Sequence, residues 1–339
     1  MSRGTKIVAS LLTAAVLPGC SALLPHPAPP SAAPSSAHSS APSPTTSTAG
    51  PAIDAAGAQR QLETYVDLNN KANKARDGEQ LKAYEAGSSL PIDQASYRSS
   101  KILYPKQRSY TPFGYTDATF HTPAGQPWFA ADVVSTNLVT KKPSKVRTLL
   151  LFRKGEDGWR QVYSPYTLEA KPFPGLAKDG SGQAVARSLT DGTGLLSSPA
   201  EFVKLYARQL AGKTPTEQQR LFADDAWVKD AVAERVRMSQ YAKVSTTVRP
   251  APDYPSYALR TAAGGALVLS TLSRTVRFDV KPGMNVFHSK EGLLKGKFYR
   301  FMQRRELIQI VAHIPAKSAQ NGKFRLVAAY GGIVEGSGR

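Results

Sequence analysis

Cysteine is nearly absent from this sequence, which has a single one, Cys20, in 339 residues. One cysteine cannot form a disulfide within the chain or a multi-cysteine metal site. Since it lies close to the amino terminus, ahead of any segment able to form a core, we also exclude a thiol nucleophile in a folded active site.

Charge is absent from residues 21–52, which contain no Asp, Glu, Lys or Arg. Pro, Ser, Ala and Thr dominate this stretch, and such a composition buries too little apolar surface to offset the entropy of ordering. We therefore expect a disordered stalk. If extended in polyproline fashion, it reaches about 3.1 Å per residue, or roughly 100 Å in all.

Long hydrophobic runs are also missing. The apolar run at residues 7–17 has eleven residues, whereas a membrane-spanning helix needs about 20. Arg3 and Lys6 precede it, as in the basic segment of a secretory signal peptide. We therefore expect a signal at 1–19 that is removed from the mature protein.

The order of residues at the end of this run, Leu17-Pro18-Gly19-Cys20, resembles the lipobox of bacterial lipoproteins. The resemblance implies that Cys20 carries a diacylglycerol and becomes the first residue of the mature chain. Residues 20–52 are then the lipidated cysteine and its stalk, and the protein is extracytoplasmic, anchored to the cell membrane. The alternative is an ordinary signal peptide with an incidental cysteine.

Acidic residues are few relative to basic ones, which gives a formal charge of +19. Residues 53–190 hold 19 basic and 13 acidic residues, a net +6, and residues 191–339 hold 23 and 12, a net +11. The densest cluster is a candidate polyanion contact and comprises Lys290, Lys295, Lys297, Arg300, Arg304 and Arg305.

This basic cluster has apolar residues interleaved. Their spacing allows a short helix seated on the body with its cations outward, and equally an interfacial segment whose apolar side chains touch the acyl boundary of a bilayer. Outside the cell the available polyanions are anionic lipid headgroups and wall polymers, so no nucleic acid is expected. The alternative is a solvated basic face that only increases solubility.

One pattern, helices followed by long strands, occurs twice after the stalk. The first occurrence has helical spacing at 54–77 and 79–87, and strand-like segments at 116–122, 127–136, 146–154 and 158–166. The second has helix-start signals at Ser198 and Thr214, a helical run at 224–242, and strand-like segments at 243–250, 265–280, 305–315 and 322–332.

These patterns predict an α+β fold of two tandem modules, each with helices packed on a strongly bent antiparallel sheet. The expected boundaries are 53–170 for the first module, 171–190 for a linker, 191–334 for the more basic second module and 335–339 for a tail. The pattern resembles the cone-shaped nuclear-transport-factor-2-like superfamily, in which helices close over a bent sheet to leave a pocket. Two such modules behind a Pro/Ser stalk are similar to uncharacterised lipoproteins of high-GC Gram-positive bacteria.

Catalytic motifs are missing as well. The sequence has no His-Glu-x-x-His, Gly-x-Ser-x-Gly or Ser-x-x-Lys, which argues against zincins, α/β hydrolases and Ser-Lys acyl enzymes. The three body histidines, His121, His288 and His313, have no metal-ligand spacing, so we expect neither metal nor cofactor. Two residues remain as speculative pocket groups: Asp132, on a strand face with Trp128, and His313, opposite an isoleucine face.

From these observations the sequence favours a non-catalytic binding or interaction module anchored at the membrane. Two alternatives stay open. One is a small-pocket acid/base enzyme that uses Asp132 or His313, and the other is a scaffold for a membrane-protein partner. The fold class hosts all three kinds of protein, so it does not choose among them.

Overall fold

The computed structural model describes residues 50–107, 109–168, 171–289 and 291–339. The expected signal, Cys20, nearly all of the stalk and Lys290 lie outside the described residues. Among those that are described, no helix is long and apolar enough to cross a membrane.

The amino-terminal half has three helical segments and then five strands. In chain order they are α1 (Ala55–Ala75), the 3-10 helix η1 (Gln80–Ala83), α2 (Ser89–Leu103), β1 (Phe113–His121), β2 (Trp128–Asn137), β3 (Pro143–Gly155), β4 (Gly158–Tyr163) and β5 (Tyr166–Thr167).

The carboxyl-terminal half has three helices, seven strands and a further 3-10 turn. In order they are α3 (Pro199–Ala211), α4 (Thr216–Gln219), α5 (Ala226–Met238), β6 (Ala242–Pro250), β7 (Tyr257–Arg260), β8 (Ala266–Val280), β9 (Val286–His288), η2 (Gly292–Leu294), β10 (Gly296–Phe298), β11 (Phe301–Ile314) and β12 (Arg325–Gly338).

Local sequence signals set several helix boundaries. Asp54 caps α1 by accepting a hydrogen bond from the Gly57 amide, and Ser198 caps α3 by accepting one from the Glu201 amide. Gly212 ends α3 in the left-handed conformation that glycine adopts without a steric penalty. Asp225 caps α5.

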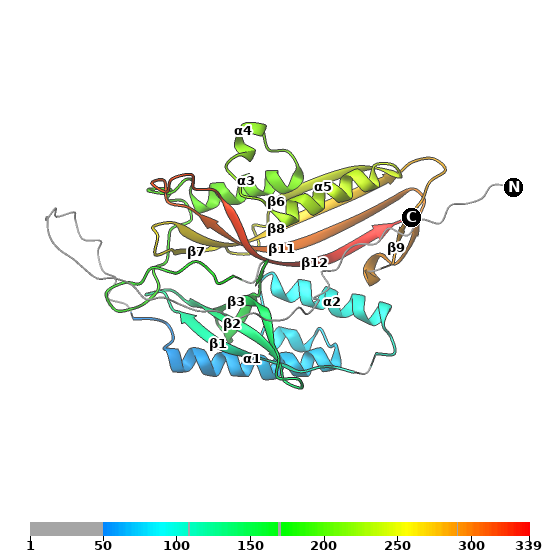
Figure 1. The fold of residues 1–339 in the computed structure, drawn as a ribbon. Helices are drawn as coiled ribbons and strands as arrows, with labels where there is room; N and C mark the ends of the chain where they lie inside the picture. Colours follow the sequence, from blue (N-terminus) through cyan, green and yellow to red (C-terminus); the bar gives the residue numbers. More distant parts are fainter. Residues whose placement is uncertain (1–49, 108, 169–170, 290) are drawn as a thin grey trace, which may run out of the picture.

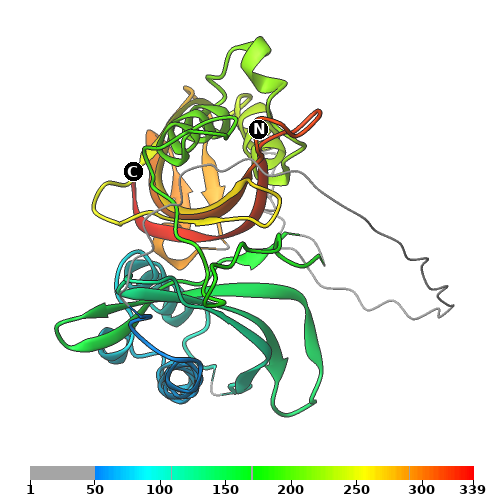
Figure 2. The same cartoon turned by 90° about the vertical axis from the view of Figure 1, so that its left-hand side faces the viewer.

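The two halves stack as layers, with α1 on the outside of the first and α3, α4 and α5 on the outside of the second, while α2 lies between them (Figures 1 and 2). On the outer face of the first half, Phe129 and Phe152 pack against Tyr65 of α1. On the outer face of the second half, Ile308, Ile310, Ala312 and Ile314 of β11 pack against α3. The isoleucine face that the sequence predicted opposite His313 on this strand is therefore confirmed.

Between the layers the two halves share an apolar core. Trp128, Leu149 and Leu151 of the first half lie in one buried cluster with Leu267, Leu269 and Val311 of the second. Helix α2 also bridges the halves, because Ile92 and Ala95 pack with Leu307 and Val334.

A buried polar network runs through the same interface. The Gln309 side-chain amide donates to the hydroxyl oxygens of Ser88 and Ser89, at 3.0 and 2.9 Å, and its carbonyl oxygen accepts from the Ser164 amide at 2.8 Å. The Ser88 and Thr271 hydroxyls lie 2.7 Å apart. These hydrogen bonds fix the position of one half relative to the other, because a shift would leave buried polar groups unpaired and cost free energy.

The α+β class and the antiparallel sheet are as predicted, but two separate modules are not confirmed. Ten strands form one hydrogen-bonded sheet, with the path β1-β2-β3-β5-β12-β11-β8-β6. The link is β5, where Tyr166 pairs with Thr148 of β3 and both β5 residues pair with β12. Two residues thus join strands that the pattern assigned to different modules.

One helix was missed, and two local predictions are wrong. Residues 89–103, which were not assigned to any element, form α2. Helix α4 begins at Thr216 without a side-chain cap, and the Thr214 hydroxyl is buried without a partner. Around the basic cluster the chain forms η2 and the β9–β10 hairpin rather than an amphipathic helix, because β10 pairs with β9.

Candidate functional site

The basic cluster separates into an exposed part and a buried part. Lys290 lies outside the described residues, while Lys295, Lys297 and Arg300 are exposed on and just beyond the β9–β10 hairpin. Among the described residues none of these three forms an ion pair. They remain able to contact a polyanion.

Arg304 and Arg305 do not share this position. Arg304 is 3 % exposed and is ion-paired to two glutamates, so it cannot reach a polyanion. Arg305 is half-buried and ion-paired to Glu335 of β12. The expected contact through Arg304 is therefore wrong. The reason is the alternation along β11, which turns this side chain toward α5.

Helix α2 adds to the exposed part. The Gly292 amide donates to the Ser99 hydroxyl at 2.7 Å, which holds the end of α2 beside η2, and Figure 1 shows α2 ending near this hairpin. Lys101, near the end of α2, and Lys106, just beyond it, are exposed as well. We call Lys101, Lys106, Lys295, Lys297 and Arg300 the basic end. The exposed apolar side chains Ile102, Tyr104 and Tyr299 belong to the same segments.

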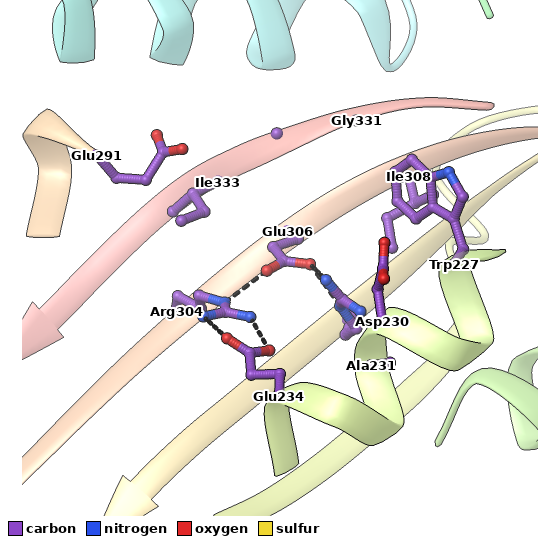
Figure 3. A pocket seen from close by; sticks show the side chains of 12 residues that line it. Trp227, Asp230, Ala231, Glu234, Glu291, Arg304, Glu306, Ile308, Gly331 and Ile333 are labelled. Atoms are coloured by element: carbon purple, nitrogen blue, oxygen red, sulfur yellow. Dashed lines mark hydrogen bonds and ion pairs between the residues drawn. The ribbon is translucent and has the colours of Figure 1, made fainter. Parts of the chain in front are cut away.

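A pocket of about 280 Å³ lies between α5 and the strands β8, β11 and β12 (Figure 3). Its charged lining residues are Asp230, Glu234, Arg274, Glu291, Arg304 and Glu306. Trp227, Ala231, Ile308 and Ile333 form the apolar part of the wall, and Gly331 contributes only backbone.

Four of the charged groups bind one another in an ion-pair network. Arg304 donates through both terminal nitrogens to the two Glu234 carboxylate oxygens, at 2.9 and 2.6 Å, and through Nε to Glu306 at 2.5 Å. Arg274 donates to the other Glu306 oxygen. Figure 3 shows the contacts of Arg304 with Glu234 and with Glu306.

The pKa values of these groups follow from burial and charge. Burial opposes ionisation of Glu234, but the hydrogen bonds and charge of Arg304 outweigh it, so the pKa of Glu234 is lowered. The pKa of Glu291 is raised, chiefly by burial, and the charge of Arg304 offsets this only in part. Glu291 therefore holds a proton more readily than Glu234 does.

His288 lies buried nearby, 5 % exposed, and neither ring nitrogen has a hydrogen-bond partner. Burial lowers the pKa of His288 to about 4, with a smaller contribution from the charge of Arg304. This imidazole is therefore neutral at physiological pH. In the described part of the chain no group of three His, Cys, Asp or Glu side chains is arranged to hold a metal ion.

The two speculative pocket residues, Asp132 and His313, are not brought together. Asp132 lies on β2 and accepts a hydrogen bond from Arg147 Nε at 2.6 Å, while Arg147 also pairs with Asp117. Burial raises the pKa of Asp132 and Arg147 opposes this. His313 lies half-buried on β11, and burial lowers its pKa. Neither residue lines the pocket beneath α5.

The pocket residues escaped prediction because they converge from five segments of the chain. One local signal points to them: Arg304 and Glu306 are two positions apart on a strand, so their side chains share a face. A charged pair on an otherwise apolar strand indicates a buried partner. The sequence alone does not show that α5 supplies it through Glu234.

The described residues thus form an α+β unit with one polar pocket beneath a helix and a basic end. The chain belongs to the family described as "Domain of unknown function (DUF8094)", whose family model matches residues 49–338. That match covers both halves of the sheet and excludes the signal and most of the stalk.

Two similar proteins come from Streptomyces coelicolor. The uncharacterized lipoprotein SCO2278 is 31 % identical over 234 residues, which are 65 % of this chain and 67 % of that protein. The uncharacterized lipoprotein SCO6871 is 28 % identical over 248 residues, 69 % of each chain. Both comparisons support a relation to bacterial lipoproteins, and neither bears on the cone-shaped modules.

Proposed function

We propose that the protein is a lipid-anchored, surface-exposed envelope lipoprotein that binds anionic lipid headgroups through its basic end, without catalysis. The observation that carries this proposal is the basic end itself, where five exposed cations have no acidic partner among the described residues. Anchorage through Cys20 rests on the lipobox resemblance and on the lipoprotein names of the relatives.

Headgroups fit this surface better than a wall polymer because of its apolar side chains. Ile102, Tyr104 and Tyr299, on the same segments as the cations, are 46, 59 and 61 % exposed. Interfacial segments combine cations with apolar side chains in this way, since the cations contact phosphates while the apolar groups enter the acyl boundary. Each basic residue near an anionic membrane contributes about 1 kcal/mol.

The pocket beneath α5 supports the finer part of the fold proposal. A helix that covers a bent sheet and leaves a cavity is the arrangement expected of a nuclear-transport-factor-2-like cone. We propose that the carboxyl-terminal half is such a cone, and that the shared β5 link and interface join the amino-terminal half to it.

A vesicle experiment tests the headgroup proposal. Residues 21–339, without signal and Cys20, are mixed with anionic vesicles, neutral vesicles and purified phosphate-rich wall polymer. We expect binding to anionic vesicles that weakens with salt. The triple reversal Lys295→Glu, Lys297→Glu and Arg300→Glu should abolish it. Reversal of three exposed lysines elsewhere, Lys178, Lys213 and Lys323, changes the net charge equally and should not.

The outcomes separate the alternatives. Binding to wall polymer but not to vesicles would replace headgroups by polymer. Equal loss in both triple variants would mean that only net charge matters, and the basic end would then be a solubilising face. If neither polyanion binds, a scaffold for a membrane-protein partner or a pocket enzyme becomes the better account. Co-purification from envelopes and the effect of Glu291→Gln on any detected activity would then distinguish these two.

A further inference from the structure

The pocket beneath α5 has a charge opposite to that of the protein around it. Its lining contains four carboxylates and two guanidinium groups, a net −2 when all are ionised, in a chain of net charge +19. We infer that this pocket binds a small organic cation that carries an ammonium group.

An anionic ligand fits poorly because the arginines already have partners. Arg304 is 3 % exposed and uses its two terminal nitrogens on Glu234 and its Nε on Glu306. Arg274 is bound to Glu306. An anion at Arg304 would have to displace a carboxylate from this buried guanidinium, which would leave that carboxylate buried and unpaired.

Two carboxylates remain for a ligand. Asp230 and Glu291 line the pocket, and among the described residues neither has a basic side chain within ion-pair distance. They lie on different elements, Asp230 on α5 and Glu291 just before η2, so each offers a carboxylate to an ammonium group at its own side of the pocket. Figure 3 shows them on either side of the ion-pair network.

The remaining walls also suit an alkylated ammonium ion. Trp227 lines the pocket beside Asp230, and the face of an indole attracts cations by about 0.5–2 kcal/mol. Ala231, Ile308 and Ile333 offer apolar contacts for methyl or methylene groups. The volume of about 280 Å³ is just below the roughly 300–1,000 Å³ of pockets for drug-sized ligands. The pocket therefore takes a small molecule or the end group of a larger one.

Calorimetric titration of residues 21–339 with choline and with ethanolamine tests this inference. The matched neutral probe is 3,3-dimethyl-1-butanol, which has the shape of choline without its charge, and the anionic probe is inorganic phosphate. We expect one or both ammonium compounds to bind at least tenfold more tightly than the neutral isostere, and phosphate not to compete. The charge of choline does not depend on pH, so its affinity should fall as the pH is lowered and Glu291, whose pKa is raised by burial, takes up a proton.

Two variants locate the binding. At least one of Asp230→Asn and Glu291→Gln should weaken ammonium binding at least fivefold, whereas Asp224→Asn, an exposed carboxylate outside the pocket, should leave it unchanged. Three results would each overturn the inference. They are no binding of either ammonium compound at a ligand concentration of about 50 mM, about one-third of physiological ionic strength, equal binding of choline and its neutral isostere, and tighter binding of phosphate than of either ammonium compound. Because Asp230 is an exposed helix residue, loss of folding does not confound its variant.

Discussion

Asp93 and Glu85 form a buried carboxyl pair whose effect on stability depends on pH. Glu85 is 1 % exposed and neither carboxylate oxygen has a hydrogen-bond partner. Asp93, on α2, accepts a hydrogen bond from the Tyr330 hydroxyl of β12. The pKa of Glu85 is raised, first by burial and then by the charge of Asp93. Burial raises the pKa of Asp93 to about 6, although the Tyr330 hydrogen bond opposes the rise.

The sign of the effect follows from proton linkage. A carboxyl group whose pKa is higher in the folded than in the unfolded protein binds its proton more tightly when folded. Its contribution to the free energy of unfolding is largest at pH values below the unfolded pKa. This contribution is lost as the pH rises through the folded pKa. The pKa of Asp93 is about 6 in the folded protein and about 3.9 in the unfolded chain. This difference lowers the free energy of unfolding by about 1 kcal/mol at pH 4.5 and by about 3 kcal/mol at pH 7.5, relative to low pH.

Asp93→Asn removes this charge and keeps an oxygen that accepts from Tyr330. We therefore expect the variant to be more stable than the parent by about 3 kcal/mol at pH 7.5 and by about 1 kcal/mol at pH 4.5. Urea unfolding followed by tryptophan fluorescence at the two pH values gives both differences. Glu234 and Glu335, whose pKa values are lowered, make stability depend on pH in the opposite direction. Their contributions are the same in variant and parent, so they cancel in the difference between the two proteins.

Asp67→Asn, which removes an exposed carboxylate from α1, serves as the control and should change stability by less than about 0.5 kcal/mol at both pH values. A destabilised Asp93→Asn variant at pH 7.5, or a difference that does not vary with pH, would refute the reasoning. Either result would mean that the ionised carboxylate is stabilised by its surroundings rather than destabilised by burial.

Three further changes have defined outcomes. Cys20→Ala should move the protein from the membrane fraction to the soluble fraction in cell fractionation, and unchanged membrane association would contradict lipid anchorage. Arg304→Met leaves Glu234 and part of Glu306 buried without their partner, so we expect a loss of about 3–5 kcal/mol in urea unfolding; a loss under about 1 kcal/mol would show that the network is solvated. Gln309→Leu leaves the Ser164 amide unpaired between the halves and should lower the unfolding free energy by about 2–3 kcal/mol, with one shared transition. Two separate transitions in the parent protein would instead show that the halves unfold independently.

Local signals in the sequence predicted the elements better than their assembly. The apolar spacing around Leu62 and Tyr65 identified α1, and Ser198-Pro199 identified the start of α3, because caps and amphipathic spacing are short-range properties. Helix α2 was missed, since Ser88, Ser89 and Pro91 are typical of a loop. The Ser88 and Ser89 hydroxyls are instead held by Gln309, more than 200 residues away.

The same limit applies to the candidate site. The composition correctly placed Lys295, Lys297 and Arg300 at the surface, but charge density alone could not separate them from Arg304, four residues beyond Arg300 in the same run. That separation depends on the acid supplied by α5. The pocket needed Glu234, Arg274 and Glu291 to converge, and no spacing in the sequence encodes that convergence.

The most direct test of the central claim compares how strongly two proteins partition onto anionic vesicles: residues 21–339 and their Lys295→Glu, Lys297→Glu, Arg300→Glu variant. At about 1 kcal/mol per cation, loss of three should weaken partitioning about 100-fold at low ionic strength. The difference should shrink as added salt shortens the Debye length from about 10 Å at 0.1 M toward 3 Å at 1 M. Equal partitioning of the two proteins at low salt would contradict the claim that the basic end binds the membrane surface.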